Sequence, residues 1–261
     1  MGKIPARPVM GAAKPKVEQA SGAELPFVDL EHDSFEDFKD INMSTMAVPF
    51  VRILQALSPQ TKKNDDAYVD GAEEGLWFNT VTRHVYGDTI LFIPLKFEHV
   101  FIEWRPERGG FVGYHDPSNA ERLAVDKAFG KWRTAEGNIL QENYVYMGAV
   151  DGFESEGVVV LSLASSMIKT AKNWNKLMTS HVMSNGQKAR PYYLVWCLKT
   201  EYVSNDKGSW YVPSVKFEKY ITEAQYSLVK KEQKALPARQ VDYALLESEK
   251  AGEAVAEDSQ F

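Results

Sequence analysis

The segment PYYLVWCLKTEYVSNDKGSWYVPSVKF, residues 191–217, decides the fold class of this chain. Two runs rich in β-branched and aromatic residues, 191–202 and 209–217, flank the sequence Asn-Asp-Lys-Gly at 205–208. Asparagine, aspartate and glycine between two such runs are typical of a β-hairpin, because these residues tolerate the backbone angles of a tight turn. We therefore predict an antiparallel pair of strands here.

Strand-like runs dominate the remaining sequence, and helices are few. Only residues 120–131, 162–183 and 223–235 have helical spacing of their apolar residues. Because the strands do not alternate with helices, the pattern favours a mainly β or α+β fold, an antiparallel sheet or barrel, over a parallel βαβ sheet. Further strands are predicted at 47–57, 76–82, 89–105, 143–150 and 157–163, with Pro94 splitting the third of these or placing it at an edge.

The composition is that of a globular protein and excludes several classes. The chain has 261 residues, of which 44% are hydrophobic and 25% are charged. Its longest apolar runs are about five residues, whereas a membrane-spanning helix needs about 20, and the N-terminus lacks the apolar core of a signal peptide. The single cysteine, Cys197, can form no internal disulfide. We expect a cytoplasmic protein, in the host cytoplasm if the chain is viral, with no membrane partner.

The acidic residues are concentrated near the ends of the chain. Residues 1–23 carry four basic side chains against one acidic, and residues 24–40 carry one against seven. Residues 41–241 are nearly balanced, with 24 basic and 22 acidic side chains, whereas 242–261 have one against six. We expect a disordered arm and an acidic segment at 1–40, one folded domain at 41–241 and a disordered acidic tail at 242–261.

Residues 157–200 are basic although the whole protein is acidic. They contain no Asp or Glu in 44 positions, where about six would be expected from the frequency of 36 in 261. A local positive field of this kind favours an anionic ligand, most often nucleic acid, although a chance fluctuation on a solvated surface is the alternative. The basic side chains of the segment are Lys169, Lys172, Lys176, Lys188, Arg190 and Lys199.

The helix predicted at 162–183 would place apolar and basic residues on opposite sides. At 100° per residue, Lys169, Lys172 and Lys176 fall within about 60° of one another. Surface helices usually intersperse Glu with Lys, and this helix has none, so an anionic partner is favoured over a merely solvated face. The opposite, packing stripe contains Met167, Ala171, Trp174 and Met178, which assigns Trp174 to the core rather than to base stacking.

Two of the predicted strands alternate an apolar set with a set of aromatic and charged residues. Single strands of nucleic acid are typically bound by a basic groove together with aromatic rings on a sheet. If the apolar set faces the core, the other set forms a binding surface. Each residue taken singly favours core or edge packing, and only the combination with the basic helix favours binding. That candidate surface contains Phe101, Arg105, Tyr193 and Lys199. Arg190, three residues before Tyr193, is a further candidate for phosphate contact.

Both the acidic tail and the basic segment favour nucleic acid as the ligand. A mobile polyanion tethered to a cationic surface can compete with nucleic acid for that surface, whereas a tail that only confers solubility is the alternative. The tail residues considered for this competition and for partner binding are Glu253, Glu257, Asp258 and the final Phe261.

The ending Glu257-Asp258-Ser259-Gln260-Phe261 is similar to the tails of bacterial and bacteriophage single-stranded DNA-binding proteins. The stretch VVVLSLASSMIKTAKNWNKL at 158–177, followed by PYY at 191–193 and NDKGSW at 205–210, resembles phage proteins of that role. The resemblance implies an OB-like barrel with an inserted helix and a C-terminal helix. It also implies sequence-tolerant binding of single strands in phage replication or recombination, and a tail that recruits polymerase or primase–helicase. The chain is longer than the bacterial form and lacks its Pro-Phe ending.

An enzyme is the main alternative class, and the sequence does not favour it. The five histidines have no metal-ligand spacing, and CxxC, HExxH and GxxxxGK[ST] motifs are missing. Cys197 lies in a predicted strand, where an inert buried thiol is expected. Glu98, Glu103 and Asp116 could assemble a Mg²⁺-dependent nuclease site, but their spacing does not require one. We predict a non-catalytic protein without metal or cofactor, leave a homodimer open, and keep a virion or scaffold protein as a third class.

Overall fold

The predicted hairpin is present in the computed structural model, which describes residues 47–106, 110–127, 132–206, 208–236, 241 and 243. Strands β9 (Leu194–Asn205) and β10 (Gly208–Tyr220) are antiparallel, and Gly208 pairs with Asn205 across the turn. Residues 191–193 were predicted as strand but form a 3₁₀ turn, η7 (Pro191–Tyr193). The predicted arm at 1–40 and the tail at 242–261, except for Tyr243, lie outside the described residues.

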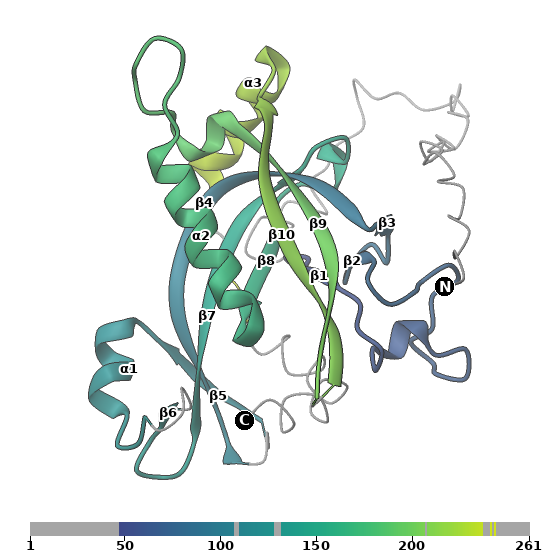
Figure 1. Cartoon of the computed structure of the whole chain (residues 1–261), viewed down its shortest axis with the longest axis vertical. Helices are drawn as coiled ribbons and strands as arrows, with labels where there is room; N and C mark the ends of the chain where they lie inside the picture. Colours follow the sequence, from purple (N-terminus) through teal and green to yellow (C-terminus); the bar gives the residue numbers. More distant parts are fainter. Residues whose placement is uncertain are drawn as a thin grey trace, which may run out of the picture. The chain divides into compact units, whose positions relative to one another are not determined.

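The hairpin is one edge of a seven-stranded antiparallel sheet with the order β10-β9-β4-β7-β6, in which β5 also pairs with β4 and β8 with β7 (Figure 1). A smaller sheet has the order β1-β2-β3. The mainly β, antiparallel prediction is therefore confirmed. The remaining strands are β1 (Val51–Ile53), β2 (Trp77–Asn79), β3 (Val85–Gly87), β4 (Thr89–Trp104), β5 (Phe111–His115), β6 (Trp132–Arg133), β7 (Ile139–Val150) and β8 (Val159–Ala164).

The large sheet is a curled half-barrel (Figure 1). The OB-like barrel that the resemblance implied is not confirmed. Its order ends on β10 and β6, and these two strands do not pair with each other among the described residues. Strand β4 is the central strand of this sheet. It pairs with β7 along most of its length, with β9 at its start and with β5 at its end. Pro94 does not split β4, because a β-bulge between Pro94 and Lys96 accommodates a residue that has no N–H for the ladder.

Both faces of the sheet are buried against other elements. On the face covered by helix α2 (Ile168–Ser180), here called the α2 face, Phe92, Tyr146 and Trp196 belong to the largest core cluster. On the opposite face Ile102 and Val145 belong to a second cluster, which includes Leu236 and Tyr243 from the C-terminal part of the described chain. When one strand residue faces the first core, the next residue can therefore face the second core instead of solvent.

Of the three predicted helices, one is confirmed in full and two begin elsewhere. Helix α3 (Glu223–Ala235) starts at a capping box formed by Thr222 and Gln225. Residues 162–164 belong to β8, and a 3₁₀ turn (Ser165–Met167) separates that strand from α2. None of the described helices is long and apolar enough to cross a membrane.

The helix predicted at 120–131 is displaced toward the N-terminus, where α1 (Pro117–Leu123) forms. The Asp116 carboxylate accepts hydrogen bonds from the N–H groups of Ser118 and Asn119, at 2.9 and 3.1 Å. This cap, with Pro117 at the first position, fixes the start of the helix. Beyond it, Asp126 bridges to Arg133 as extended chain.

Candidate nucleic-acid interface

Helix α2 is attached to the sheet by the apolar stripe predicted from its sequence. Ala171, Trp174 and Met178 are buried, and the Trp174 ring centroid lies 4.3 Å from that of Tyr146 on β7. The Tyr146 hydroxyl lies 2.9 Å from the Asn175 Oδ1 and 3.2 Å from the Ala171 carbonyl oxygen, and donates its one proton to these two acceptors on α2. The assignment of Trp174 to the core is confirmed.

The exposed side of α2 carries Lys169, Lys172 and Lys176, here called the lysine stripe. The Lys172 side chain is 60% exposed; its Nζ lies 3.9 Å from the Glu142 Oε1 and 5.8 Å from the Tyr144 ring centroid. Lys169 and Lys176, one turn before and after it, have no ion pair with any carboxylate in the described parts of the chain. An ion pair this long and exposed is worth little, so the stripe keeps most of its positive charge.

Beside the lysine stripe, the α2 face carries a row of rings that we call the aromatic strip: Phe97, His99 and Tyr144. The Phe97 centroid lies 5.7 Å from that of Tyr144, and the His99 centroid 4.6 Å from it. Phe97 is 41% exposed. Burial, and then the nearby Glu142, raises the pKa of Tyr144 to about 12, so this ring is neutral at ordinary pH. The strip was missed from the sequence, although Phe97 and His99 alternate with the apolar set in the same way as Phe101.

Phe101, predicted to stack on bases, is not available to a ligand. It is only 4% exposed, and its ring stacks on Trp132 at 4.7 Å. The same cluster includes Ala120 of α1 and Leu140 of β7. The prediction was wrong because it assumed one free face of the strand, whereas α1 and β6 cover this end. Arg105 is exposed directly after β4, at the end of the strand that pairs with β5.

Lys199 lies apart from the lysine stripe. Its neighbour Leu198 belongs to the core of the α2 face, so Lys199, one residue further along β9, faces the other way. Its Nζ lies 4.0 Å from the Asp88 Oδ2, and both side chains are exposed. Lys199 therefore does not share a surface with the lysine stripe, contrary to the prediction.

Arg190 and Tyr193 lie near α3 rather than over the middle of α2. Arg190 is exposed and directly precedes η7, and Tyr193 is the last residue of that turn. The Tyr193 ring centroid lies 6.0 Å from that of Tyr226 on α3. The structure thus does not bring the predicted residues together: Lys169, Lys172 and Lys176 share the lysine stripe, Arg190 and Tyr193 lie at this second location, and Phe101, Arg105 and Lys199 lie elsewhere.

The carboxylates considered for a nuclease site are not brought together. Glu98 and Glu103 belong to opposite faces of β4: Glu98 accepts a hydrogen bond from the Tyr243 hydroxyl at 2.7 Å, and Glu103 lies 2.7 Å from the His115 Nε2. Asp116 caps α1. Within the described ranges, no three His, Cys, Asp or Glu side chains form a group that could hold a metal ion.

Cys197 is buried in β9, and burial is the main cause that raises the pKa of its thiol. Because the thiolate is the reactive form, we expect a disulfide-exchange reagent at pH 8 to modify native protein at least about 100-fold more slowly than protein unfolded in urea. The absorbance of the released thiol checks this. Equal rates in the two states would mean that β9 opens readily.

The fold and the site together define a mainly antiparallel β protein that carries a cationic helix on one face of a curled sheet. The model of the Pam3 phage gp34-like protein family matches residues 18–242, and this chain belongs to that bacteriophage family. No curated protein and no solved structure matches the chain.

Proposed function

We propose that this phage protein is a non-catalytic protein that binds single-stranded DNA with little sequence preference during DNA replication or recombination. One observation carries the proposal: the lysine stripe of α2 meets the aromatic strip of β4 and β7 at Lys172, which lies over the ring of Tyr144, and Phe97 of that strip is exposed. Basic side chains and aromatic rings on one surface are the combination that single strands require.

The two sets of side chains would act on different parts of the strand. Lys169, Lys172 and Lys176 would neutralise phosphates and release condensed counterions, which makes the affinity depend on salt. Phe97 offers an exposed ring to a base, and stacking is worth about 1–3 kcal/mol per base without regard to sequence. Bases within a duplex cannot present their faces to a ring, so the strip favours single strands.

The acidic tail completes the proposal. Residues 242–261 carry six acidic side chains against one basic, and they would compete with DNA for the lysine stripe. When DNA occupies the stripe, Glu253, Glu257, Asp258 and Phe261 would be released to recruit replication proteins such as polymerase or primase–helicase. Deleting the tail should tighten DNA binding at low salt.

The test removes the two lysines of the stripe that lack a described ion pair. We expect the variant Lys169→Gln/Lys176→Gln to bind oligo-dT about 25-fold more weakly at 0.1 M salt. Each lost phosphate contact reduces the slope of log affinity against log salt concentration by about 0.7, so two lost contacts lower the affinity about 25-fold at 0.1 M relative to 1 M. The difference should shrink as the salt approaches 1 M. Fluorescence anisotropy of a labelled oligonucleotide over a salt series measures both quantities.

The matched control is Lys62→Gln/Lys63→Gln, which removes two exposed lysines from the loop after η2 (Pro59–Thr61). Its affinity and salt slope should stay near those of the unmodified protein. Equal affinities of the two variants would reject the lysine stripe as the binding surface. Mg²⁺-dependent cleavage of the oligonucleotide would favour the nuclease alternative, and a lack of binding at low salt would favour a scaffold or virion role.

A further inference from the structure

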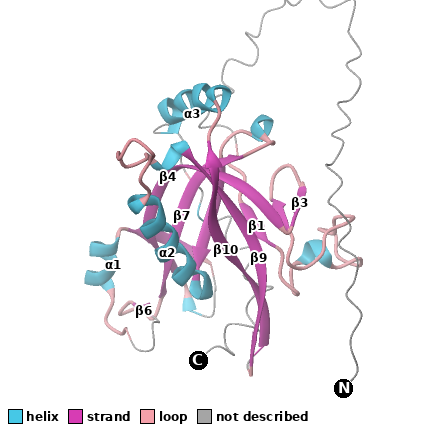
Figure 2. Cartoon of the chain, turned by 45° about the horizontal axis from the view of Figure 1, so that its top comes forward, coloured by secondary structure: helices cyan, strands magenta, loops and turns pink. Residues whose placement is uncertain are grey.

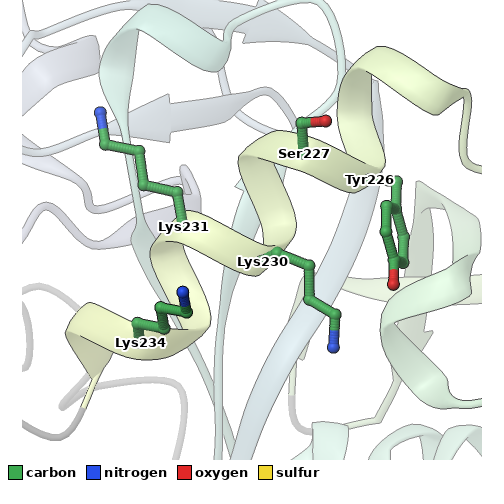
Figure 3. A pocket seen from close by; sticks show the side chains of 5 residues that line it. All are labelled: Tyr226, Ser227, Lys230, Lys231 and Lys234. Carbon is green, nitrogen blue, oxygen red and sulfur yellow. The ribbon is translucent and has the colours of Figure 1, made fainter.

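A second group of lysines and tyrosines lies where α3 meets η7. Lys230, Lys231 and Lys234 project from α3 and, with Tyr226 and Ser227, line an open pocket of about 630 Å³ (Figure 3). We call these lysines, together with Tyr226 and its neighbours Tyr192 and Tyr193, the α3 surface. The sequence predicted helix α3 but not the basic surface that it carries.

One lysine of the α3 surface, Lys230, contacts the tyrosines, and the tyrosines contact one another. The Lys230 Nζ lies 5.4 Å from the ring centroid of Tyr192 and 5.7 Å from that of Tyr226. The Tyr192 and Tyr193 centroids are 4.8 Å apart. Tyr226 is 41% exposed, so its ring is open to a further partner. This arrangement sets ammonium groups and an exposed aromatic ring around one opening, which suits a nucleotide.

The other side of α3 holds the surface in place. Val229 is buried and clusters with Ile93 of β4 and Val195 of β9, and Tyr192 packs against the same cluster. The rings and lysines are therefore carried by an anchored helix and a turn that leads directly into β9. A preorganised surface loses less conformational entropy when a ligand binds.

The lysines of the α3 surface have no ion-pair partner in the described part of the chain. Considering only the residues that the structure describes, Lys230, Lys231 and Lys234 form no ion pair, whereas Lys219 at the end of β10 pairs with Asp151 at 2.7 Å. Three neighbouring ammonium groups repel one another unless an anion lies between them. The ligand of this surface should thus carry several negative charges.

The start of α3 lies near the C-terminal end of α2. Helix α2 ends at Ser180, and the next residue, His181, has its Nε2 3.0 Å from the Tyr220 hydroxyl at the end of β10. Thr222, two residues after Tyr220, caps α3. Figures 1 and 2 both show α3 at the end of the sheet toward which α2 runs. A chain of phosphates that follows α2 would reach α3 next.

We propose that the α3 surface is a second contact for the same single strand of DNA, with phosphates at Lys231 and Lys234 and a base on the ring of Tyr226. This inference rests on the proposed function and extends it, because it predicts a binding path over two helices. Helix α2 alone is about 20 Å long, so a strand that occupies both surfaces must be longer than one that occupies either.

The test compares two oligo-dT lengths, about 5 and about 20 nucleotides, within the range of site sizes known for single-strand binding domains. We expect Lys231→Gln/Lys234→Gln to weaken binding of the long oligonucleotide about 25-fold at 0.1 M salt. Its effect on the short oligonucleotide should be smaller, because the lysine stripe and aromatic strip can hold that one alone. The control is again Lys62→Gln/Lys63→Gln.

A second pair of variants tests the stacking contact separately. Tyr226→Ala should weaken binding of the long oligonucleotide roughly tenfold, within the range for loss of one stacked base. Tyr202→Ala, which removes an exposed tyrosine from the β9–β10 hairpin, should match the unmodified protein. Tyr226 contributes little to a core, so loss of folding does not explain the expected difference.

The outcomes separate this inference from the proposed function. If the α3 variants match their controls while Lys169→Gln/Lys176→Gln still loses affinity, the α3 surface is not a DNA contact and the proposed function stands. If the unmodified protein binds neither oligonucleotide at low salt, the proposed function fails and the inference fails with it. A loss confined to the long oligonucleotide in both α3 variants supports the two-helix path.

Discussion

Replacement of Gly148 by alanine is expected to destabilise the fold by about 3 kcal/mol, at the upper end of the usual cost of overpacking. An added Cβ would lie 2.3 Å from the Ile93 carbonyl oxygen and 2.4 Å from a ring carbon of Phe92. Gly148 pairs with Pro94, so β4 and β7 cannot separate without breaking their ladder. The Phe92 ring cannot retreat easily either, because it packs against Trp174 of α2.

Urea unfolding of Gly148→Ala, followed by tryptophan fluorescence, measures this cost. The matched control is Gly113→Ala on β5, where an added Cβ would meet nothing within 4 Å. That variant should stay within about 0.5 kcal/mol of the unmodified protein, as is usual for surface substitutions. If both variants unfold at the same urea concentration, the close packing of Phe92 over Gly148 is wrong.

Elements specified by local chemistry were predictable from the sequence. The hairpin of β9 and β10 follows from Asn205, Asp206 and Gly208 between two β-rich runs, and its turn lies where those residues indicate. Helix α3 likewise carries its own start signal, a capping box four residues long at Thr222. In both cases the residues that fix the element are close neighbours in the sequence, and the distant contacts of the fold agree with them.

Boundaries fixed by distant contacts were not predictable. Residues 162 and 163 were predicted both as the end of the strand at 157–163 and as the start of the helix at 162–183. With Ala164 they belong to β8 because β7 pairs with them: Ser162 with Val145 and Ala164 with Asn143. Strand pairing between segments so far apart leaves no trace in the local spacing.

The candidate site shows the same limit. The alternation in β4 correctly separates Phe101 from Ile102, but only the tertiary structure reveals that α1 and β6 cover Phe101 while Phe97 stays partly exposed. The α3 surface was missed because Glu223 and Glu232 mask its lysines in a charge count, and because its tyrosines come from two segments more than thirty residues apart. A charge pattern finds a basic segment, whereas a binding surface depends on which segments the fold brings together.

Replacement of Trp174 by alanine is expected to cost about 4 kcal/mol, as for other large aromatic residues removed from a core. The ring is fully buried, and its centroid lies 4.3 Å from that of Tyr146, 5.9 Å from that of Phe92 and 6.2 Å from that of Trp196. Because this ring attaches α2 to the sheet, the variant should also lose oligo-dT affinity under conditions in which the sheet remains folded.

Two further variants separate packing from other effects. Leu177→Ala, on the same helix but 37% exposed, should cost less than about 1 kcal/mol and leave DNA binding unchanged. Trp174→Phe should cost less than Trp174→Ala, because phenylalanine keeps a ring in the core and leaves a smaller cavity than alanine does. Thermal unfolding and anisotropy titrations measure the two properties. If Trp174→Ala lowers stability but binds oligo-dT like Leu177→Ala, the position of α2 on the sheet does not determine DNA binding, and the lysine stripe is not the surface that holds the strand.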